Sequence, residues 1–137
     1  NAQLDSSVTA LYLNGTTLYV AGSFNYVGGN ARANLAAVNA STGALISGFD
    51  GGVTSNINAM TGNGSNLIIG GDFTTVNAQN YNNRGAVFDV ATGALQPNFP
   101  WVNGTISAAI PDGANGWYIG GMFTQVGTVT SNNCAIR

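Results

Sequence analysis

Residues 21–39 read AGSFNYVGGNARANLAAVN, and the pattern of this stretch returns twice further along the 137-residue chain. Its first four residues, AGSF, correspond to GGDF at 70–73 and GGMF at 120–123, so the spacings are 49 and 50 residues. Each phenylalanine is followed three residues later by a valine. Fixed offsets of this kind identify an internal repeat, and a repeat of this length governs the fold of the whole chain.

Both flanks of the stretch repeat as well. Upstream, alternating segments begin at Val8, Ile57 and Ile106, and downstream two repeats share the turn sequence TGAL, at 42–45 and 92–95. These offsets divide the chain into a first repeat at 1–56, a second at 57–105 and a truncated third at 106–137.

Each repeat predicts four short strands. In the first repeat, residues 8–13 alternate, and residues 17–21 are apolar on both faces, as expected of a strand covered by a sheet on either side. The third strand is predicted at Leu35–Asn39 and the fourth around Leu45, with equivalents in the second repeat. No segment sustains the apolar spacing of a helix, which indicates an all-β fold.

Glycine marks two kinds of position in this pattern. Asn14-Gly15 and Asn63-Gly64 predict two-residue hairpin turns in which both central residues take positive φ. Gly22, Gly71 and Gly121 end the second strand of each repeat. We expect these three to accept no side chain, through positive φ or through close approach of a neighbouring strand.

Four strands in about 50 residues are typical of a β-propeller blade, in which radially packed sheets bury both faces. The sequence therefore predicts three tandem four-stranded propeller-type blades of 49–50 residues, the last incomplete. A β-solenoid is the alternative, but its coils are usually about half as long.

The charged residues are few and of only two types. Three arginines and five aspartates carry all the charge, because the chain has no His, Lys or Glu. Without His there is no Ser-His or Cys-His nucleophile and no imidazole metal ligand, and without Lys there is no Schiff base. No basic cluster exists to neutralise phosphates, so no nucleic-acid partner is expected. No apolar run approaches the length of a membrane span, so no membrane insertion is expected.

Aspartate alone remains for acid–base work, and a glycosidase-like pair is the surviving enzyme hypothesis. Its carboxylates would be Asp72 and Asp89, at repeat positions held in the first repeat by Ser23 and Asn39. The arginines available to such a site are Arg32, Arg84 and Arg137. Residues placed by a repeat usually serve the repeat, so we predict that the chain is not an enzyme and has no catalytic residues.

Loop residues suggest weaker ligand sites. Asp50-Gly51-Gly52 and Asp112–Gly116 offer oxygen ligands for Ca²⁺, but both are also good turn sequences, so no metal site or cofactor is predicted. Aromatic side chains in loops rich in Asn and Thr are candidates for binding glycans. These residues are Tyr26, Tyr81 and Trp101.

Other positions have structural or covalent interpretations. Trp117 and Tyr118 replace apolar residues of the second strand, so both are predicted in the core, and Cys134 is interpreted as a small buried hydrophobe. Four sequons lie beside glycine or a Thr-Gly turn and are candidate N-glycosylation sites. They begin at Asn14, Asn39, Asn63 and Asn103.

The pattern at 21–39, with Val-x-Ala-Leu before it and Gly-x-Leu and Phe after it, resembles the delta-sixty class of bacterial propeller repeats. The resemblance covers nearly the whole chain and is strongest in the first repeat, whereas the second has Val76-Asn77-Ala78 in place of Val-Gly-Gly. It implies a secreted or surface protein of many repeats, and it implies no activity, because the class has no general catalytic assignment.

These observations favour a non-catalytic structural or adhesive module, extracellular or on the cell surface. A glycan-binding, lectin-like propeller is the alternative, and an Asp-based glycoside hydrolase comes third. Three blades cannot close a ring, and they leave apolar faces and strand edges uncovered. The expected partners are therefore further blades of the same protein, or identical subunits joined through strand edges into a ring or filament. We expect that residues 1–137 do not form a stable isolated monomer.

Overall fold

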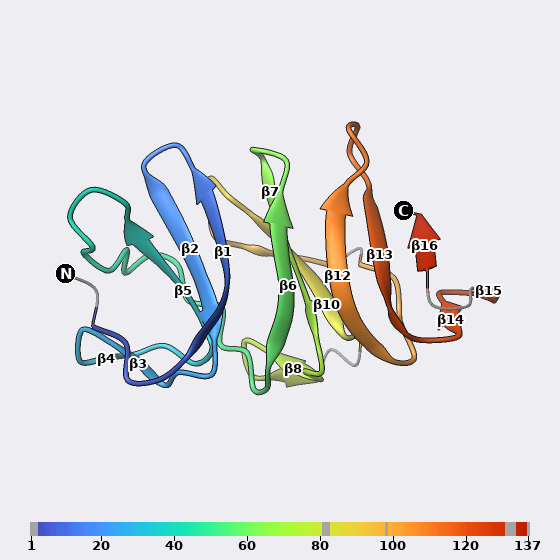
Figure 1. The fold of residues 1–137 in the computed structure, drawn as a ribbon, viewed down its shortest axis with the longest axis horizontal. Helices are drawn as coiled ribbons and strands as arrows, with labels where there is room; N and C mark the ends of the chain where they lie inside the picture. The colour runs from blue at the N-terminus through green and yellow to red at the C-terminus, as the bar shows by residue number, and fades with distance from the viewer. Residues whose placement is uncertain (1–2, 81–82, 98, 131–133, 137) are drawn as a thin grey trace.

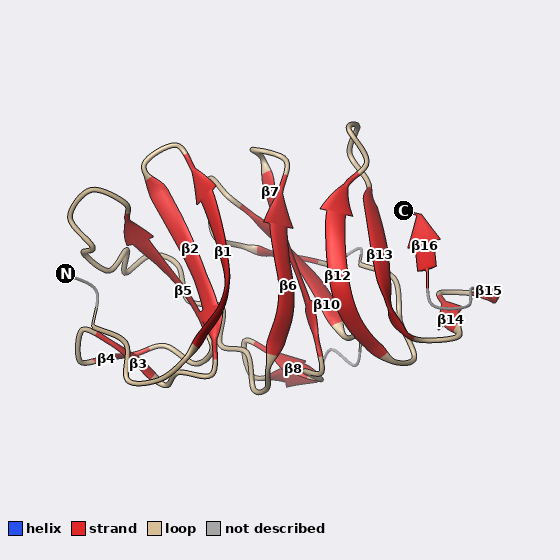
Figure 2. Ribbon diagram, in the orientation of Figure 1, coloured by secondary structure: helices blue, strands red, loops and turns tan. Residues whose placement is uncertain are grey.

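The computed structural model describes residues 3–80, 83–97, 99–130 and 134–136. All regular structure in these ranges is β-strand, arranged in antiparallel sheets (Figure 2). The prediction of an all-β fold is confirmed. Its cause is local, because dense Gly, Asn and Thr disfavour helices, while the alternating apolar segments suit pleated sheets.

Three larger sheets follow the three repeats and stand side by side (Figure 1). Sheet 1 has the strand order β1 (Val8–Asn14), β2 (Thr17–Gly22), β5 (Leu35–Asn39). Sheet 2 has the order β6 (Ile57–Gly62), β7 (Asn66–Gly71), β10 (Gly85–Asp89), β11 (Leu95–Gln96). Sheet 3 has the order β12 (Thr105–Pro111), β13 (Trp117–Met122), β16 (Cys134–Ile136).

The fourth predicted strand of each repeat is only partly formed. Leu95 begins β11 in sheet 2, whereas Leu45, its equivalent in the first repeat, makes a single bridge to Val38. The first three strands of the first repeat begin at the predicted residues and end within one residue of the prediction.

Three small hairpins follow the repeated phenylalanines. In Figure 1 the first two lie on the lower side of the molecule and the third lies at its right-hand end. They are β3 (Tyr26–Val27) with β4 (Asn30–Ala31), β8 (Thr75–Val76) with β9 (Gln79–Asn80), and β14 (Gln125–Val126) with β15 (Val129–Thr130). A residue that precedes each larger sheet bridges its hairpin, in the pairs Leu4–Val27, Val53–Val76 and Val102–Val126. The repeated valine after each Phe therefore anchors the hairpin to the segment that leads into the first strand of its sheet.

The turn after β1 differs from the prediction. Asn14 is the last residue of β1 and pairs with Thr17, so the loop is Gly15-Thr16. Only Gly15 has a positive φ, of 58°. A positive φ at the first central residue alone is the pattern of a type II′ turn, which matches the strand twist as well as type I′ does.

Ala78 occupies the tip of the β8–β9 hairpin with a φ of 60°, where the first repeat has Gly29 at 81°. A Cβ in the left-handed region costs about 1–2 kcal/mol, and the greater freedom of an unfolded glycine offsets part of this. We expect Ala78→Gly to raise the free energy of unfolding by about 0.5–1 kcal/mol in urea titrations. Ala40→Gly, at an exposed turn residue without positive φ, is the control and should lower it.

Sheet 2 is covered on both faces. Leu67 and Ile69 of β7 belong to a core shared with sheet 1, and Ile68 between them belongs to a core shared with sheet 3. All three are at most 1% exposed. Strand β6 contacts both β1 and β12, so the first strands of the three sheets are neighbours. The alternation of the second strand therefore builds two cores at once.

Trp117 and Tyr118 were both predicted to be core residues. Trp117 is 4% exposed and packs in the core shared with sheet 2. The prediction is wrong for Tyr118, which is 39% exposed. Successive side chains of a strand point to opposite faces, so Tyr118 lies on the face of sheet 3 that is turned away from sheet 2.

The repeated glycines at 22, 71 and 121 sit where another backbone crosses them. A Cβ added to Gly71 would overlap the carbonyl oxygen of Asn56, and the equivalent oxygens of Ser7 and Thr105 cover Gly22 and Gly121. None of the three glycines has a positive φ. Each glycine also pairs with the residue of β1, β6 or β12 after which the strand pairing shifts register. Of the two predicted reasons, close strand approach is therefore the one that applies.

Candidate functional site

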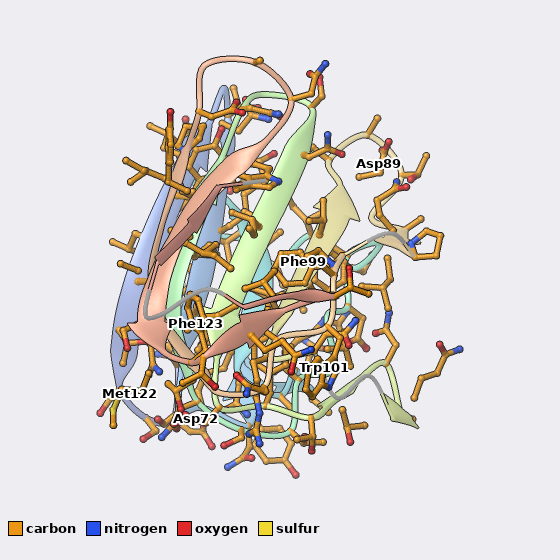
Figure 3. All side chains as sticks on the ribbon, turned by 90° about the vertical axis from the view of Figure 1, so that its right-hand side faces the viewer. Asp72, Asp89, Phe99, Trp101, Met122 and Phe123 are labelled. Atoms are coloured by element: carbon orange, nitrogen blue, oxygen red, sulfur yellow. The ribbon has the colours of Figure 1, made fainter. Side chains whose placement is uncertain are left out.

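A cleft of about 400 Å³ opens between sheets 2 and 3. Its walls combine apolar and aromatic side chains with three amides and one carboxylate. The lining residues are Asn66, Val87, Asp89, Gln96, Phe99, Asn115 and Trp117. Figure 3 shows Asp89 above Phe99 on the same side of the molecule.

Strand ends position the polar groups of this cleft. Asn66 begins β7 and pairs with Asp89 at the end of β10, while Val87 pairs with Gln96 of β11. The loop between β12 and β13 contributes Asn115. Hydrogen-bonding side chains thus converge on apolar walls, which is the general composition of a small-molecule site.

A second cleft of about 200 Å³ lies between sheets 1 and 2, at the equivalent place in the repeat. Four positions of the repeat line both clefts. They hold Thr17, Ala37, Ile46 and Phe49 in the smaller cleft and Asn66, Val87, Gln96 and Phe99 in the larger one. Residues 90–93 complete its lining, and a Cβ on Gly93 would lie 3.4 Å from the Phe49 ring. The sequence analysis did not identify either cleft. The available signal was departure from the repeat, above all Gln96 in place of Ile46 and Asp89 in place of Asn39.

The Asp89 carboxylate caps the turn that follows β10. It accepts hydrogen bonds from the backbone N–H of Thr92 at 2.9 Å and from the Thr92 hydroxyl at 3.1 Å. Both hydrogen bonds hold the pKa of Asp89 below its usual value, and the bond from the Thr92 backbone N–H has the larger effect. In the first repeat the uncharged side-chain oxygen of Asn39 caps the equivalent turn. It accepts hydrogen bonds from the N–H groups of Ser41 and Thr42 at 2.9 Å.

This difference predicts an acid sensitivity that Asp89→Asn should reduce. A carboxyl whose folded pKa is depressed stabilises the fold above its unfolded pKa of about 3.9, and this stability is lost as pH falls through the folded pKa. We expect the melting temperature of Asp89→Asn to fall less than that of the wild type between about pH 5 and pH 2. The pKa of Asp5 is also lowered, by the N–H groups of Tyr26 and Asn25, so part of the acid sensitivity should remain. Parallel acid titration curves for the two proteins would contradict the assignment.

The structure does not bring the hydrolase candidates together. Asp72 follows the last residue of β7, whereas Asp89 pairs with the first, and the two lie at opposite ends of the molecule in Figure 3. Six residues of strand span about 20 Å, which exceeds the roughly 5–10 Å between glycosidase carboxylates. The Asp72 carboxylate instead accepts a hydrogen bond from the hydroxyl of Thr105, the first residue of β12 in sheet 3.

The described arginines hold loops in place. Arg32 donates to the carbonyl oxygens of Phe49 at 3.2 Å and Ser47 at 3.0 Å, and it pairs with Asp50 at 3.7 Å. Arg84 donates to the carbonyl oxygen of Asp72 at 2.7 Å. Arg137 lies outside the described residues.

The aspartates of the two calcium candidates both contact other groups of the protein. The Asp112 carboxylate accepts from the N–H groups of Ala114 at 2.7 Å and Gly116 at 3.1 Å, and Asp50 pairs with Arg32. Among the described residues, no group of three or more His, Cys, Asp or Glu side chains is placed to hold a metal ion. Asp112 therefore caps its own turn, whereas Asp50 forms an ion pair with a loop arginine.

The glycan-binding candidates are exposed but separate. Tyr26 lies in β3 and is 51% exposed, and Trp101 lies beside the bridge to β14 and is 44% exposed. In Figure 1, β8 of the second hairpin lies between β3 and β14. Tyr81 lies outside the described residues. The two described aromatics therefore do not form one site.

The four sequons differ in which side-chain atom is engaged. The amide nitrogens of Asn14 and Asn103, the atoms that would carry a glycan, donate to the carbonyl oxygen of Gly64 at 3.1 Å and to the Thr124 hydroxyl at 2.9 Å. Asn39 and Asn63 accept backbone hydrogen bonds through their side-chain oxygens. Glycosylation at Asn14 or Asn103 would therefore leave a single N–H on a nitrogen that already donates an internal hydrogen bond. The side chain of Cys134, predicted to be buried, is not among those described.

No protein-family model matches the chain, and no curated protein matches it. Among solved structures, the crystal structure of the computationally designed Ika4 protein is similar in fold, with a TM-score of 0.54 and 12% sequence identity. The match covers 98% of this chain and 92% of that chain. At this identity the likeness is one of fold alone. In the described residues there is no helix long and apolar enough to span a membrane.

Proposed function

We propose that this chain is a non-catalytic structural or adhesive module of an extracellular or cell-surface protein, built of three tandem propeller-type blades. The observation that carries the proposal is the repetition of the contacts between sheets. The Thr9 hydroxyl donates to the carbonyl oxygen of Ile57 at 2.8 Å, and the equivalent Asn58 amide donates to that of Ile106 at 3.3 Å. Each sheet thus meets the next through the same positions, as the blades of a propeller or the units of a solenoid do.

The polar groups of the described chain support a non-catalytic role. Its carboxylates cap turns, pair with a loop arginine or join neighbouring repeats, and each such role is a structural one. The chain presents mainly Asn, Thr, Ser and Gly as its polar residues. A surface of this kind suits contacts with neighbouring proteins or surfaces more than it suits chemistry.

The cellular location is open to direct measurement. Antibodies raised against the purified chain should label intact cells of its source organism in immunogold electron microscopy. An antibody against a cytoplasmic protein is the control and should label only permeabilised cells. Labelling by the new antibody only after permeabilisation would refute the extracellular assignment.

Glycan binding is the second candidate function, and the cleft between sheets 2 and 3 favours it. Amides and a carboxylate beside aromatic rings are the groups that bind sugar hydroxyls and the apolar faces of sugar rings. On a glycan array, Gln96→Ile, which restores the residue of the first repeat, should abolish saturable binding at the cleft. Tyr26→Ala and Trp101→Ala should leave it intact. Loss of binding in either aromatic variant would instead assign the glycan site to the hairpin loops.

A further inference from the structure

The two outermost sheets each carry an exposed apolar stripe on the face turned away from sheet 2. On sheet 1 the stripe lies along β1, where Leu11 and Leu13 are each 59% exposed and Val8 is 42% exposed. On sheet 3 it crosses β12 and β13, where Ile110 is 60% exposed and its cross-strand partner Tyr118 is 39% exposed. Uncovered apolar side chains gathered on one face indicate an interaction surface.

Within the chain, the equivalents of these two stripes cover each other. Met60 and Gly62, equivalent to Leu11 and Leu13, pack against sheet 1, where a Cβ on Gly62 would overlap the Tyr12 ring. Tyr12 is in turn the equivalent of Ile110. In both internal contacts, the face of one sheet that is turned toward the C-terminal repeats packs on the face of the next sheet that is turned toward the N-terminal repeats.

The first strands of sheets 2 and 3 each bury an isoleucine near their start. Ile57 and Ile106 are fully buried, and a Cβ on Gly70 would overlap the Ile106 side chain, so that this glycine leaves the hollow that Ile106 fills. The equivalent of Ile106 in the first repeat is the exposed Val8, and the equivalent of Gly70 in the third is Gly120. Sheet 1 therefore carries a half-exposed valine where sheets 2 and 3 have a buried isoleucine, and sheet 3 carries a glycine at the position of Gly70.

A hydrogen-bond donor is placed beside the same contact. Thr9 donates to the carbonyl oxygen of Ile57 near the start of β6, and Asn58 donates to that of Ile106 near the start of β12. Ser107 holds the equivalent position in β12 and is exposed. Its hydroxyl is positioned to donate to a carbonyl equivalent to those of Ile57 and Ile106, which is the carbonyl of Val8.

We propose that a second molecule of this chain docks head to tail on the first, with its β1 stripe covering the β12–β13 stripe. Val8 of the docked molecule packs on Gly120 as Ile106 packs on Gly70, Leu13 packs on Ile110, and the Val8 carbonyl accepts a hydrogen bond from Ser107. The proposal rests on the structural role proposed above, and it specifies a contact between sheet faces in addition to any pairing of strand edges. Because the two stripes are different surfaces, the contact is heterologous, and its repetition builds a ring or a filament.

Two charge substitutions test the contact. Leu11→Asp and Ile110→Asp each place an unpaired charge in one stripe, at side chains exposed enough for the isolated fold to tolerate the change. We expect the wild type to sediment as oligomers at micromolar concentration and each variant to sediment as a monomer. Ser65→Asp, at an exposed turn of sheet 2, is the matched control and should assemble as the wild type does.

Mixing the two variants identifies the direction of the contact. Leu11→Asp retains an intact β12–β13 stripe and Ile110→Asp an intact β1 stripe, so the equimolar mixture should form a dimer and nothing larger. If either aspartate variant unfolds, as judged by its circular dichroism melt, Leu11→Ser and Ile110→Ser replace the pair.

Three results would overturn the proposal. These are a monomeric wild type, variants that assemble like the wild type, and monomeric variants whose mixture stays monomeric. If only one of the two variants assembles, the contact joins identical stripes, and the proposal is likewise wrong. None of these results bears on surface labelling of cells, so failure of this contact and failure of the proposed function are distinguishable.

Discussion

Gly71→Val is expected to lower the free energy of unfolding by about 4 kcal/mol or more, which is among the largest effects of a single substitution. The carbonyl oxygen of Asn56 crosses directly over this glycine to accept a hydrogen bond from the N–H of Asp72 at 3.2 Å. A valine side chain would collide with that backbone oxygen, and no rotamer relieves the collision because the Cβ itself causes it. The strand β6 would have to move away from β7 at its bulge.

Gly48→Ala is the matched control. Gly48 is exposed, has no positive φ and has no atom within 4 Å of an added Cβ, so its substitution should change stability by less than about 0.5 kcal/mol. Urea denaturation of the three proteins measures both effects. An unchanged midpoint for Gly71→Val would show that the close approach of the Asn56 carbonyl is not a constraint on this residue.

Phe73→Ala should cost about 3–5 kcal/mol, a large part of the roughly 5–15 kcal/mol by which a domain is stable. The Phe73 ring is fully buried in the core shared by sheets 1 and 2, so its removal leaves a cavity that only partly collapses. Phe24 and Phe123 occupy the equivalent buried positions in the other repeats.

Tyr26→Ala removes an aromatic ring of similar size from the exposed end of a hairpin and is the control for Phe73→Ala. Because its ring is half exposed, we expect a loss of no more than about 1 kcal/mol. Thermal melts followed by circular dichroism compare the two variants. Equal losses in both would contradict the burial-based explanation of the repeated phenylalanine.

Much of the fold was predictable because the three repeats carry the same pattern, so each expected strand could be compared at equivalent positions of the other repeats. Strands β1, β2 and β5 follow from alternation and from offsets that agree across repeats. The small hairpins escaped prediction because strands of two residues leave no periodicity. Turn chemistry did mark one of them, since Gly28-Gly29 favours a two-residue turn with positive φ at both residues.

The candidate site was predictable only in fragments. Asp89 attracted attention as a carboxylate, but its link to Gln96, Phe99 and Trp117 depends on how two sheets pack, and no local pattern encodes that packing. The burial of Tyr118 was predicted wrongly because the repeat pattern does not show which sheet is outermost. Its position in the repeat equals that of the buried Ile68, and it is exposed because only one face of sheet 3 is covered within this chain.

The internal contacts have an evolutionary consequence. Sheet 2 presents one face to sheet 1 and the other to sheet 3, through equivalent positions of the repeat. A gene that gains or loses a single repeat by unequal recombination therefore encodes a stack with the same two outer faces. In such an array, length can drift between lineages without any new interface having to evolve, while substitutions within one repeat are constrained only by its immediate neighbours.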